Sequence, residues 1–201
     1  MNDYSTLNSI SDYSPVTKEI NSNASLVKLN WNGGPKTGAS ETNSLKYLQD
    51  LSAGITNPDV DVYNIGRDNL DPSIYERGKN NAPTYVGLGH ELGHVWDLLT
   101  TSPMSVKIFH FTQAAGVVTP NISYSEKNAM YWENVLRAHG NLPLRQYYNY
   151  DATNGFEYPA NITIVKSVPI LNGGKKPIAN LQTITLTNLD GTQTHTFTRT
   201  K

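Results

Sequence analysis

The stretch His90-Glu91-Leu92-Gly93-His94 constrains the fold of this chain more than any other. Residues four apart on an α-helix lie one above the other, so a helix here places both imidazoles on one face, where they can bind one metal ion. Glu91 follows the first imidazole, where a carboxylate can take a proton from a water and deliver it to a leaving group. The stretch therefore predicts a helix that carries a hydrolytic metal site. The alternative is a surface helix with two solvated histidines.

The composition limits what can hold such a metal. The chain has 201 residues, which suits one domain with a substantial core. It has no cysteine, which excludes disulfides and thiolate ligands, so a metal must be bound by histidine and carboxylate. The formal net charge is −1 and no basic stripe occurs, so we expect no nucleic-acid partner. The apolar runs are too short for a membrane-spanning segment.

The N-terminal stretch MNDYSTLNSISDYSP lacks a basic region followed by an apolar one, so no signal peptide is visible. If the protein is secreted or delivered into a target cell, we expect another route or a larger parent chain to carry it.

Hydrophobic patterning predicts an α+β fold in three segments. Residues 1–24 are polar and rich in serine and asparagine, and we expect them to be irregular. Residues 25–150 form the expected zincin-like catalytic domain. Residues 151–201 are a β-rich extension that either completes this domain or forms an appendage to it.

The expected elements follow from period-2 and period-3.6 patterns. The predicted strands cover residues 25–32, 59–65 and 162–170, with a threonine-rich hairpin at 183–187 and 194–198; the predicted helices cover 43–51, 84–99 and 123–138. Thr84 is a candidate cap, and Gly140 and Pro143 end the last helix. A strand, helix, strand and two helices in this order are typical of a zincin, in which a strand flanks the cleft and the motif helix forms its floor.

A catalytic zinc needs three protein ligands and an open position. Metzincins have their third histidine where this chain has Thr100, so that subclass is excluded. His110 lies in an apolar stretch and is expected to pack, His139 lies at a helix end, and His195 lies in the threonine-rich extension, on an expected surface strand.

Two glutamates on the helix predicted at 123–138 are the better candidates. Glu126 and Glu133 are seven residues apart and share roughly one helix face, which matches the gluzincin plan of a later helix that supplies a glutamate. Glu126 is favoured because the small Ala129 follows it, and Glu133 stays an alternative because a salt bridge with Arg137 explains it equally well. Asp97 is expected either to hydrogen-bond a ligand imidazole or to be solvated.

Two blocks of the sequence resemble a known family. VGLGHELGHVWD and SEKNAMYWENVLRAHGNLPLRQYY resemble the NleD-like zinc metallopeptidases, which include injected bacterial effectors and the C-terminal domains of RHS-type polymorphic toxins. The resemblance covers roughly residues 59–150. It implies a gluzincin-type endopeptidase with His90, His94 and Glu126 as zinc ligands and Glu91 as the general base.

The same resemblance suggests two further catalytic residues. Arg145 and Tyr148 are similar to an Arg-x-x-Tyr pair that clostridial neurotoxin-type proteases use beside the substrate carbonyl, where both groups can stabilise an oxyanion. The alternative is that Arg145 pairs with a carboxylate and Tyr148 packs. Tyr147 is a competitor for the same role.

The expected function is therefore that of a Zn²⁺-dependent endopeptidase, secreted or injected as a toxin or effector domain. Its expected partners are a protein or peptide substrate and a cognate immunity protein. Two alternatives stay open: a non-catalytic module in which zinc joins two helices, and a housekeeping peptidase inside its own cell. Glu91, the acid next to the first ligand His90, favours a catalytic site, because a structural zinc site does not need it.

Overall fold

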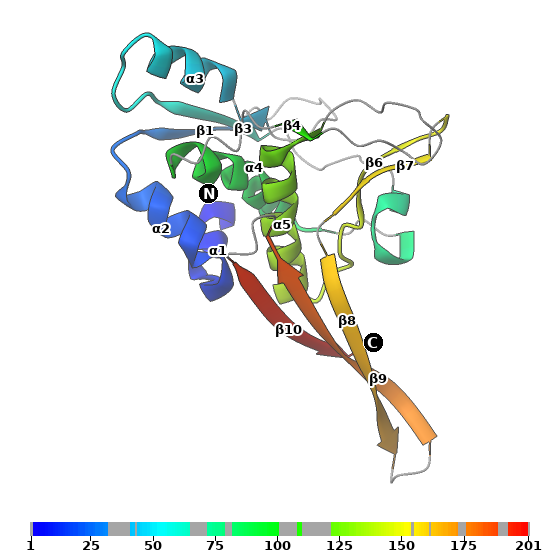
Figure 1. Cartoon of the computed structure of the whole chain (residues 1–201). Helices are drawn as coiled ribbons and strands as arrows, with labels where there is room; N and C mark the ends of the chain where they lie inside the picture. Colours follow the sequence, from blue (N-terminus) through cyan, green and yellow to red (C-terminus); the bar gives the residue numbers. More distant parts are fainter. Residues whose placement is uncertain are drawn as a thin grey trace.

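Two helices, α4 (Thr84–Leu99) and α5 (Tyr124–His139), cross at the centre of the protein in this computed structural model (Figure 1). Their bounds confirm the two helices that the sequence predicted. Thr84 is the first helical residue and not the cap, because Pro83 occupies the cap position without a side-chain hydrogen bond. The structure describes residues 2–31, 41–42, 44–64, 72–78, 82–100, 108–109, 122–153, 155–160, 162–172, 176–188 and 193–200.

Small residues set the close approach of the two helices. A Cβ on Gly93 would lie 3.1 Å from the Cα of Ala129 and 3.2 Å from the Trp132 ring, whereas a Cβ on Gly87 would meet nothing within 4 Å. Glycine is a poor helix former, so its presence in α4 needs a packing reason. At Gly93 that reason is the contact with α5, which also explains why a small residue follows Glu126 by three.

The end of α5 turns the chain back toward the helix crossing. Gly140 follows the helix as predicted, but Asn141 adopts the left-handed conformation, with a φ of 54°. The backbone N–H of Leu142 donates to the carbonyl of Arg137 at 2.7 Å, which closes the helix with a Schellman-type bond. This turn directs the next residues along the side of α5.

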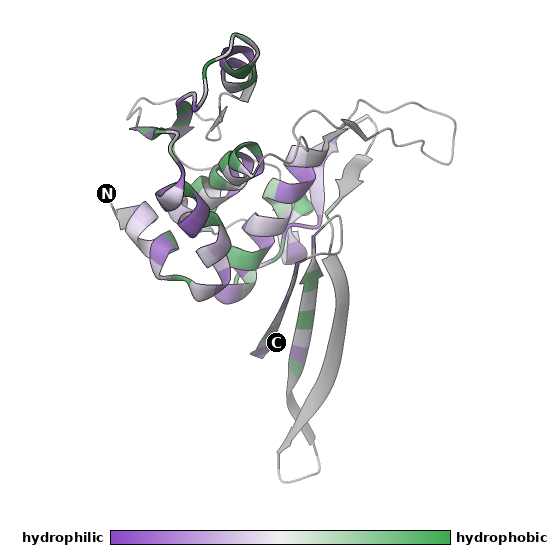
Figure 2. Ribbon diagram, turned by 60° about the vertical axis from the view of Figure 1, so that its left-hand side comes forward, coloured by the Kyte–Doolittle hydropathy of each residue, from purple (hydrophilic) through white to green (hydrophobic). Residues whose placement is uncertain are grey.

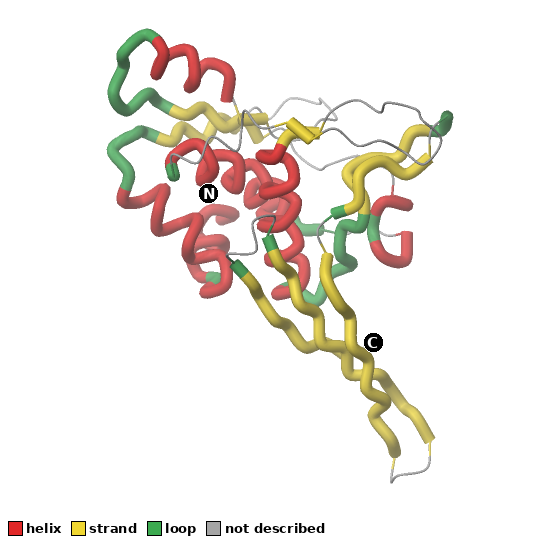
Figure 3. Tube along the Cα trace, viewed as in Figure 1, coloured by secondary structure: helices red, strands yellow, loops and turns green. Residues whose placement is uncertain are grey.

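A small mixed sheet lies on one side of α4 (Figure 3). β1 (Val27–Trp31) pairs in parallel with β3 (Val60–Asn64), and β2 (Glu41–Thr42) pairs antiparallel with the other edge of β3. The helix α3 (Ser44–Ser52) connects β2 to β3. These elements confirm the predicted strands and helix between residues 25 and 65. Their buried residues, Tyr47, Val60 and Val62, join the hydrophobic core that includes α4.

The expectation that residues 1–24 are irregular was wrong. They form α1 (Asn2–Ser9), the 3-10 turn η1 (Ser11–Tyr13) and α2 (Ser14–Ser22), which pack on α4. The apolar residues are few but spaced three or four apart, at Leu7, Ile10, Tyr13, Val16 and Ile20, and this spacing was the missed signal. Leu7, Tyr13 and Val16 are fully buried.

The C-terminal part is entirely β in its described residues. A short hairpin, β6 (Tyr147–Asp151) and β7 (Gly155–Pro159), precedes an antiparallel sheet of β8 (Ile162–Asn172), β9 (Lys176–Thr187) and β10 (Thr194–Thr200). Thr187 pairs with Thr194, so the predicted threonine-rich hairpin is confirmed. The tyrosine- and asparagine-rich strand β6 was not predicted, because its side chains do not alternate in hydrophobicity.

The far end of the β8–β9 hairpin extends well away from the helices, whereas the other end of the sheet lies on α5 (Figure 1). Hydrophobic bands alternate along the described part of β9, and its residues Ile184 and Leu186 are fully buried (Figure 2). They join one hydrophobic cluster with α4, α5 and the N-terminal helices. The extension is therefore packed onto the same core.

Shorter elements complete the chain. The polar segment before α4 contains the 3-10 turns η2 (Pro72–Ile74) and η3 (Glu76–Gly78), and β4 (Ile108–Phe109) pairs with β5 (Ile122–Ser123) ahead of α5. His110 lies outside the described residues. The fold is thus α+β with small sheets. Within the described ranges, no helix has the length and apolar character that crossing a membrane would require.

Candidate metal centre

The imidazoles of His90 and His94 lie side by side on α4, as their spacing predicted. Their ring centroids are 5.1 Å apart at an angle of 77°. Both side chains are largely buried, and Glu91 between them is 6% exposed. One potential ligand atom from each of these three residues lies within 4.8 Å of the others, so the motif alone can hold a metal ion.

Glu126 of α5 lies opposite the two imidazoles. Its Oε2 atom is 3.4 Å from Nε2 of His90 and 3.6 Å from Nε2 of His94. Ligand atoms about 2.1 Å from one tetrahedral zinc ion lie about 3.4 Å from one another. The Glu126 oxygen therefore lies at this ligand-to-ligand separation from each of the two imidazole nitrogens. Glu126 as the third ligand stays a prediction.

Glu133 lies on the other side of His90. Its Oε2 atom is 3.1 Å from Nδ1 of His90 and accepts a hydrogen bond from Arg145 at 2.7 Å, while its Oε1 accepts one from Arg137 at 2.7 Å. Since Nδ1 and Nε2 are on opposite sides of the ring, Glu133 contacts the nitrogen that faces away from Glu126. It occupies the position of a carboxylate that orients a ligand imidazole.

Ser125 and Asp97 lie on the other side of His94. The Ser125 hydroxyl is 2.6 Å from Nδ1 of His94. Asp97 is fully buried, and among the described residues neither of its oxygens has a hydrogen-bond partner of good geometry. Burial raises the pKa of Asp97 to about 6, although Ser125 and His94 lower it. Asp97 was expected to bond the imidazole directly or to be solvated, and it does neither.

The carboxylates make this a favourable place for a cation. Burial by itself lowers the pKa of His90, but its hydrogen bonds with Glu126 and Glu133 and the charge of Glu91 outweigh burial and raise that pKa to about 10. Burial likewise raises the pKa of Glu126, but His94 and His90 hold it well below its ordinary value. Without a metal, a proton on His90 therefore partly balances the surrounding negative charge.

Tyr148 on β6 lies beside the Glu126 carboxylate. Burial and the charge of Glu126 raise the pKa of its hydroxyl to about 12, against the opposite effect of Arg145. A hydroxyl with this pKa stays protonated at neutral pH and can donate a hydrogen bond. On a strand, successive side chains point to opposite faces, so the competitor Tyr147 faces away from Tyr148.

Arg145 pairs with a carboxylate, that of Glu133, as the alternative interpretation of the sequence expected. It is 4% exposed, and its guanidinium donates to Glu133 and to the backbone carbonyls of Tyr147 and Tyr148 at 2.7–3.2 Å. The guanidinium also lies 5.5 Å from the Tyr148 ring. Arg145 thus holds Glu133 and the strand that carries Tyr148, and its role toward an oxyanion stays a prediction.

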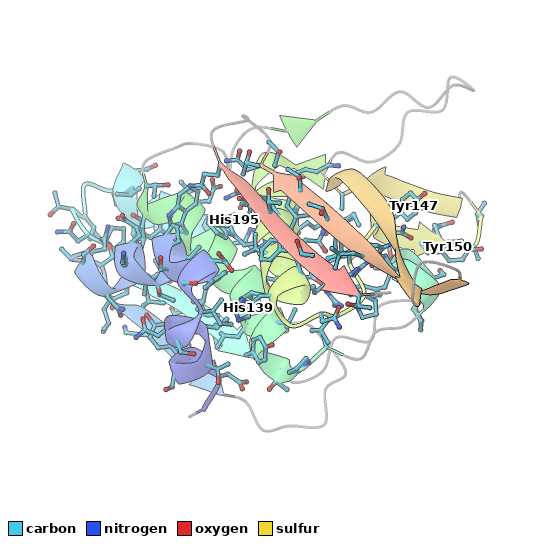
Figure 4. The ribbon with its side chains drawn as sticks, turned by 90° about the horizontal axis from the view of Figure 1, so that it is seen from below. His139, Tyr147, Tyr150 and His195 are labelled. Carbon is cyan, nitrogen blue, oxygen red and sulfur yellow. The ribbon has the colours of Figure 1, made fainter. Side chains whose placement is uncertain are left out.

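The remaining described histidines, His139 and His195, come from α5 and β10 (Figure 4). His139 ends α5, is exposed and pairs with Asp12 at 3.3 Å. His195 on β10 is only half-buried, and its Nδ1 is 2.7 Å from the Tyr131 hydroxyl. Its place on a strand was predicted, and its packing against α5 was not.

Sequence reasoning did not single out Ser125 and Asn134. Ser125 precedes the predicted ligand and contacts His94, and the side chain of Asn134 both donates to and accepts from the backbone of Arg145. The only sequence signal for Ser125 was its position next to the candidate ligand Glu126. Asn134 had none, because its partner is eleven residues away along the chain.

The donor set of two imidazoles and a carboxylate fits zinc, which binds nitrogen and oxygen ligands of this kind. Comparisons with known proteins found no matching family model, no similar curated protein and no similar solved structure. The interpretation of this centre therefore depends on its own residues.

Proposed function

We propose that the protein is a zinc-dependent endopeptidase that hydrolyses peptide bonds with metal-activated water. The observation that carries the proposal is the position of the Glu126 carboxylate oxygen, 3.4 and 3.6 Å from the Nε2 atoms of His90 and His94. These three groups would hold the ion. The buried carboxylate of Glu91, next to the first ligand on the same helix, adds the acid–base group that hydrolysis requires.

We also propose that the catalytic part has a zincin-like fold. Support comes from the sheet β1-β3-β2, whose antiparallel edge strand β2 contacts the motif helix α4. A strand beside the motif helix and a later helix that supplies a glutamate match that plan. The N-terminal helices and the C-terminal sheet are additions to it.

Each residue of the centre then has a chemical role. Glu91 takes a proton from the attacking water and delivers it to the departing amine. The Tyr148 hydroxyl, which is protonated at neutral pH, donates a hydrogen bond to the oxyanion that develops on the peptide carbonyl. Ser125 and Glu133 orient the two imidazoles through their Nδ1 atoms. When bound, zinc supplies Lewis acidity, which lowers the pKa of water and polarises a carbonyl.

The first experiment is elemental analysis of the wild-type protein beside the Glu126→Ala variant. We expect about one zinc per wild-type chain, because the three ligand atoms are preformed, and loss of the metal from the variant. Retention of zinc by both proteins would exclude Glu126 as a ligand. No stoichiometric metal in the wild type would contradict the proposal.

The second experiment tests the chemistry. The Glu91→Gln variant keeps the shape of the side chain and is expected to keep the metal but to lose hydrolysis of unfolded protein substrates. Glu19→Gln on α2 is the matched control, since it makes the same change at a glutamate whose side chain accepts a hydrogen bond from Asn23, which is not a residue of the centre. If the wild type holds zinc but cleaves nothing that the Glu91 variant leaves intact, the site is a structural one that joins α4 and α5.

The biological setting follows only from the resemblance noted in the sequence. We propose a toxin or effector that is secreted or delivered into a target cell, with a cognate immunity protein in the producing cell. Growth arrest on expression in target cells, absent with Glu91→Gln, would support this setting. Unimpaired growth with active enzyme would favour a housekeeping peptidase.

A further inference from the structure

A buried arginine near the end of β10 contacts three other parts of the protein. Arg199 on β10 has a side chain that is 4% exposed. Its Nη2 donates to both carboxylate oxygens of Glu76, at 2.7 and 2.9 Å, and its Nη1 donates to the carbonyl of Leu142 at 3.3 Å. Its Nε donates to Gln182, the residue opposite it on β9. This geometry fixes the guanidinium in one orientation.

Glu76, which binds Arg199, also binds the segment that follows α5. Its Oε2 accepts a hydrogen bond from the backbone N–H of Leu144 at 3.1 Å, and its own N–H donates to the carbonyl of Leu144 at 2.8 Å. The next residue, Arg145, pairs with Tyr75 in an isolated β-bridge. The segment from Leu142 to Arg145 is therefore held from outside by Glu76 and Arg199.

The inner side of this segment reaches the metal centre. Arg145 donates to Glu133 at 2.7 Å, and Glu133 contacts Nδ1 of His90 at 3.1 Å. Polar contacts, joined by the backbone from Leu144 to Arg145, therefore connect the C-terminal strand to an imidazole of α4. Coupling over such a distance needs a contiguous set of packed and hydrogen-bonded groups, and these contacts provide one.

We propose that Arg199 is a positioning residue of the metal centre and that the C-terminal sheet is part of its scaffold. Arg199 holds Glu76 and Leu142, these hold the backbone of Leu144, and the backbone sets the Arg145 guanidinium against Glu133. This inference rests on the proposed function, since it assigns the tail a role in the same site. It explains why β10 buries an arginine that donates hydrogen bonds to Gln182, Leu142 and Glu76.

An arginine suits this position better than a lysine. Its planar fork can bind both oxygens of one carboxylate while a second nitrogen reaches a carbonyl, whereas an ammonium presents a single point charge. Removal of the guanidinium would leave Glu76 without its cation and free the outer side of the segment. The Glu133 carboxylate would then lose part of its alignment with His90.

The test measures Co²⁺ binding to the full chain, because the visible absorption of bound Co²⁺ reports ligand geometry. We expect Arg199→Met to weaken Co²⁺ affinity about tenfold and to alter the spectrum, as loss of an outer partner of a metal ligand typically does. Thr198→Ala, an exposed neighbour on the same strand, is the control and should change neither. Urea unfolding midpoints show whether each variant is folded.

A double-mutant cycle separates positioning from general loosening. If Arg199 acts through Arg145, then Arg199→Met has no further effect on Co²⁺ affinity once Arg145 is replaced by methionine. Full additivity, or a folded Arg199→Met variant with wild-type affinity and spectrum, would overturn the inference. If the methionine variant does not fold, Arg199→Lys is measured in its place, and wild-type affinity and spectrum there overturn the inference equally. A wild-type chain that binds no Co²⁺ would instead overturn the proposed function, and the inference with it.

Discussion

His90 and His94 face the same point from the same helix, yet opposite kinds of partner support them. Behind His90 lies Glu133, whose two oxygens are shared with two buried arginines. Behind His94 lies the neutral hydroxyl of Ser125, and beyond it the carboxylate of Asp97, which has no hydrogen-bond partner among the described residues.

The difference shows that the two imidazoles of one helical motif can have different partners at Nδ1, a carboxylate for His90 and a hydroxyl for His94. The His90 side is a network in which each buried charge has an opposite charge nearby, so removal of one member leaves others unpaired. The His94 side holds a buried acid, Asp97, whose pKa is raised to about 6. We expect the first side to dominate stability and the second to dominate the response to pH.

Glu133→Gln gives the largest expected effect. It removes the carboxylate shared by Arg137 and Arg145 and leaves two buried guanidinium groups without it, so the free energy of unfolding should fall by about 3–5 kcal/mol. Urea denaturation of the metal-free protein measures this. Asp50→Asn, which breaks an exposed ion pair with Lys46 on α3, is the control and should leave the midpoint unchanged. Equal midpoints for wild type and Glu133→Gln would refute the dominance of the His90 side.

Gly93→Ala separates the helix crossing from the polar partners. The added methyl would lie 3.1 Å from the Ala129 Cα, so overpacking should lower the free energy of unfolding by about 1–3 kcal/mol. Gly87→Ala on the same helix meets nothing within 4 Å and should raise that free energy by up to about 1 kcal/mol. Thermal unfolding of both variants checks the opposite signs, and the same sign in both would mean that the crossing is looser than described.

Asp97 should give the His94 side its pH dependence. Its pKa is raised from 3.8 to about 6 in the folded protein, so the folded state binds this proton more tightly than the unfolded state. The resulting stability is fully present below pH 4 and is lost as the pH rises through about 6. With allowance for solvent screening it amounts to on the order of 1–2 kcal/mol.

Asp97→Asn cannot titrate and should lack this component. The measurement is the difference in unfolding free energy between wild type and Asp97→Asn at pH 4.5 and pH 7.5, in the presence of a chelator. The difference should shift in favour of the variant as the pH rises. A difference independent of pH would show that Asp97 is already ionised in the folded protein.

Ser125→Ala gives the smallest expected effect. It removes the hydroxyl that orients His94, and zinc affinity should fall about tenfold, or about 1.4 kcal/mol. Competition with a chromophoric chelator measures the affinity. Ser125→Thr keeps a hydroxyl and should restore most of the binding, and an equal loss in both variants would assign the effect to packing and not to the hydrogen bond.

Helices and strands that carry a clear local sequence pattern were predicted correctly from that pattern. The spacing of His90 and His94 predicted α4, the glycine after His139 predicted the end of α5, and alternation predicted β1 and β3. The threonine-rich hairpin was predicted over only part of β9 and β10. The same reasoning gave too little weight to the spacing of Leu7, Tyr13 and Val16 among polar residues. The sequence of β6 shows no alternation from which a strand could be predicted. Apart from β4, residues 101–121 lie outside the described residues.

The sequence by itself determined that two imidazoles and Glu91 share one helical turn, because helical periodicity is a local property. It also excluded thiolate ligands and favoured Glu126 over Glu133. Only the tertiary structure decided which nitrogen each glutamate contacts, that Arg145 supports Glu133, and that Arg199 reaches the segment beside the centre. Those contacts join residues from 12 to 57 positions apart along the chain, so they depend on how α4, α5 and the C-terminal sheet pack.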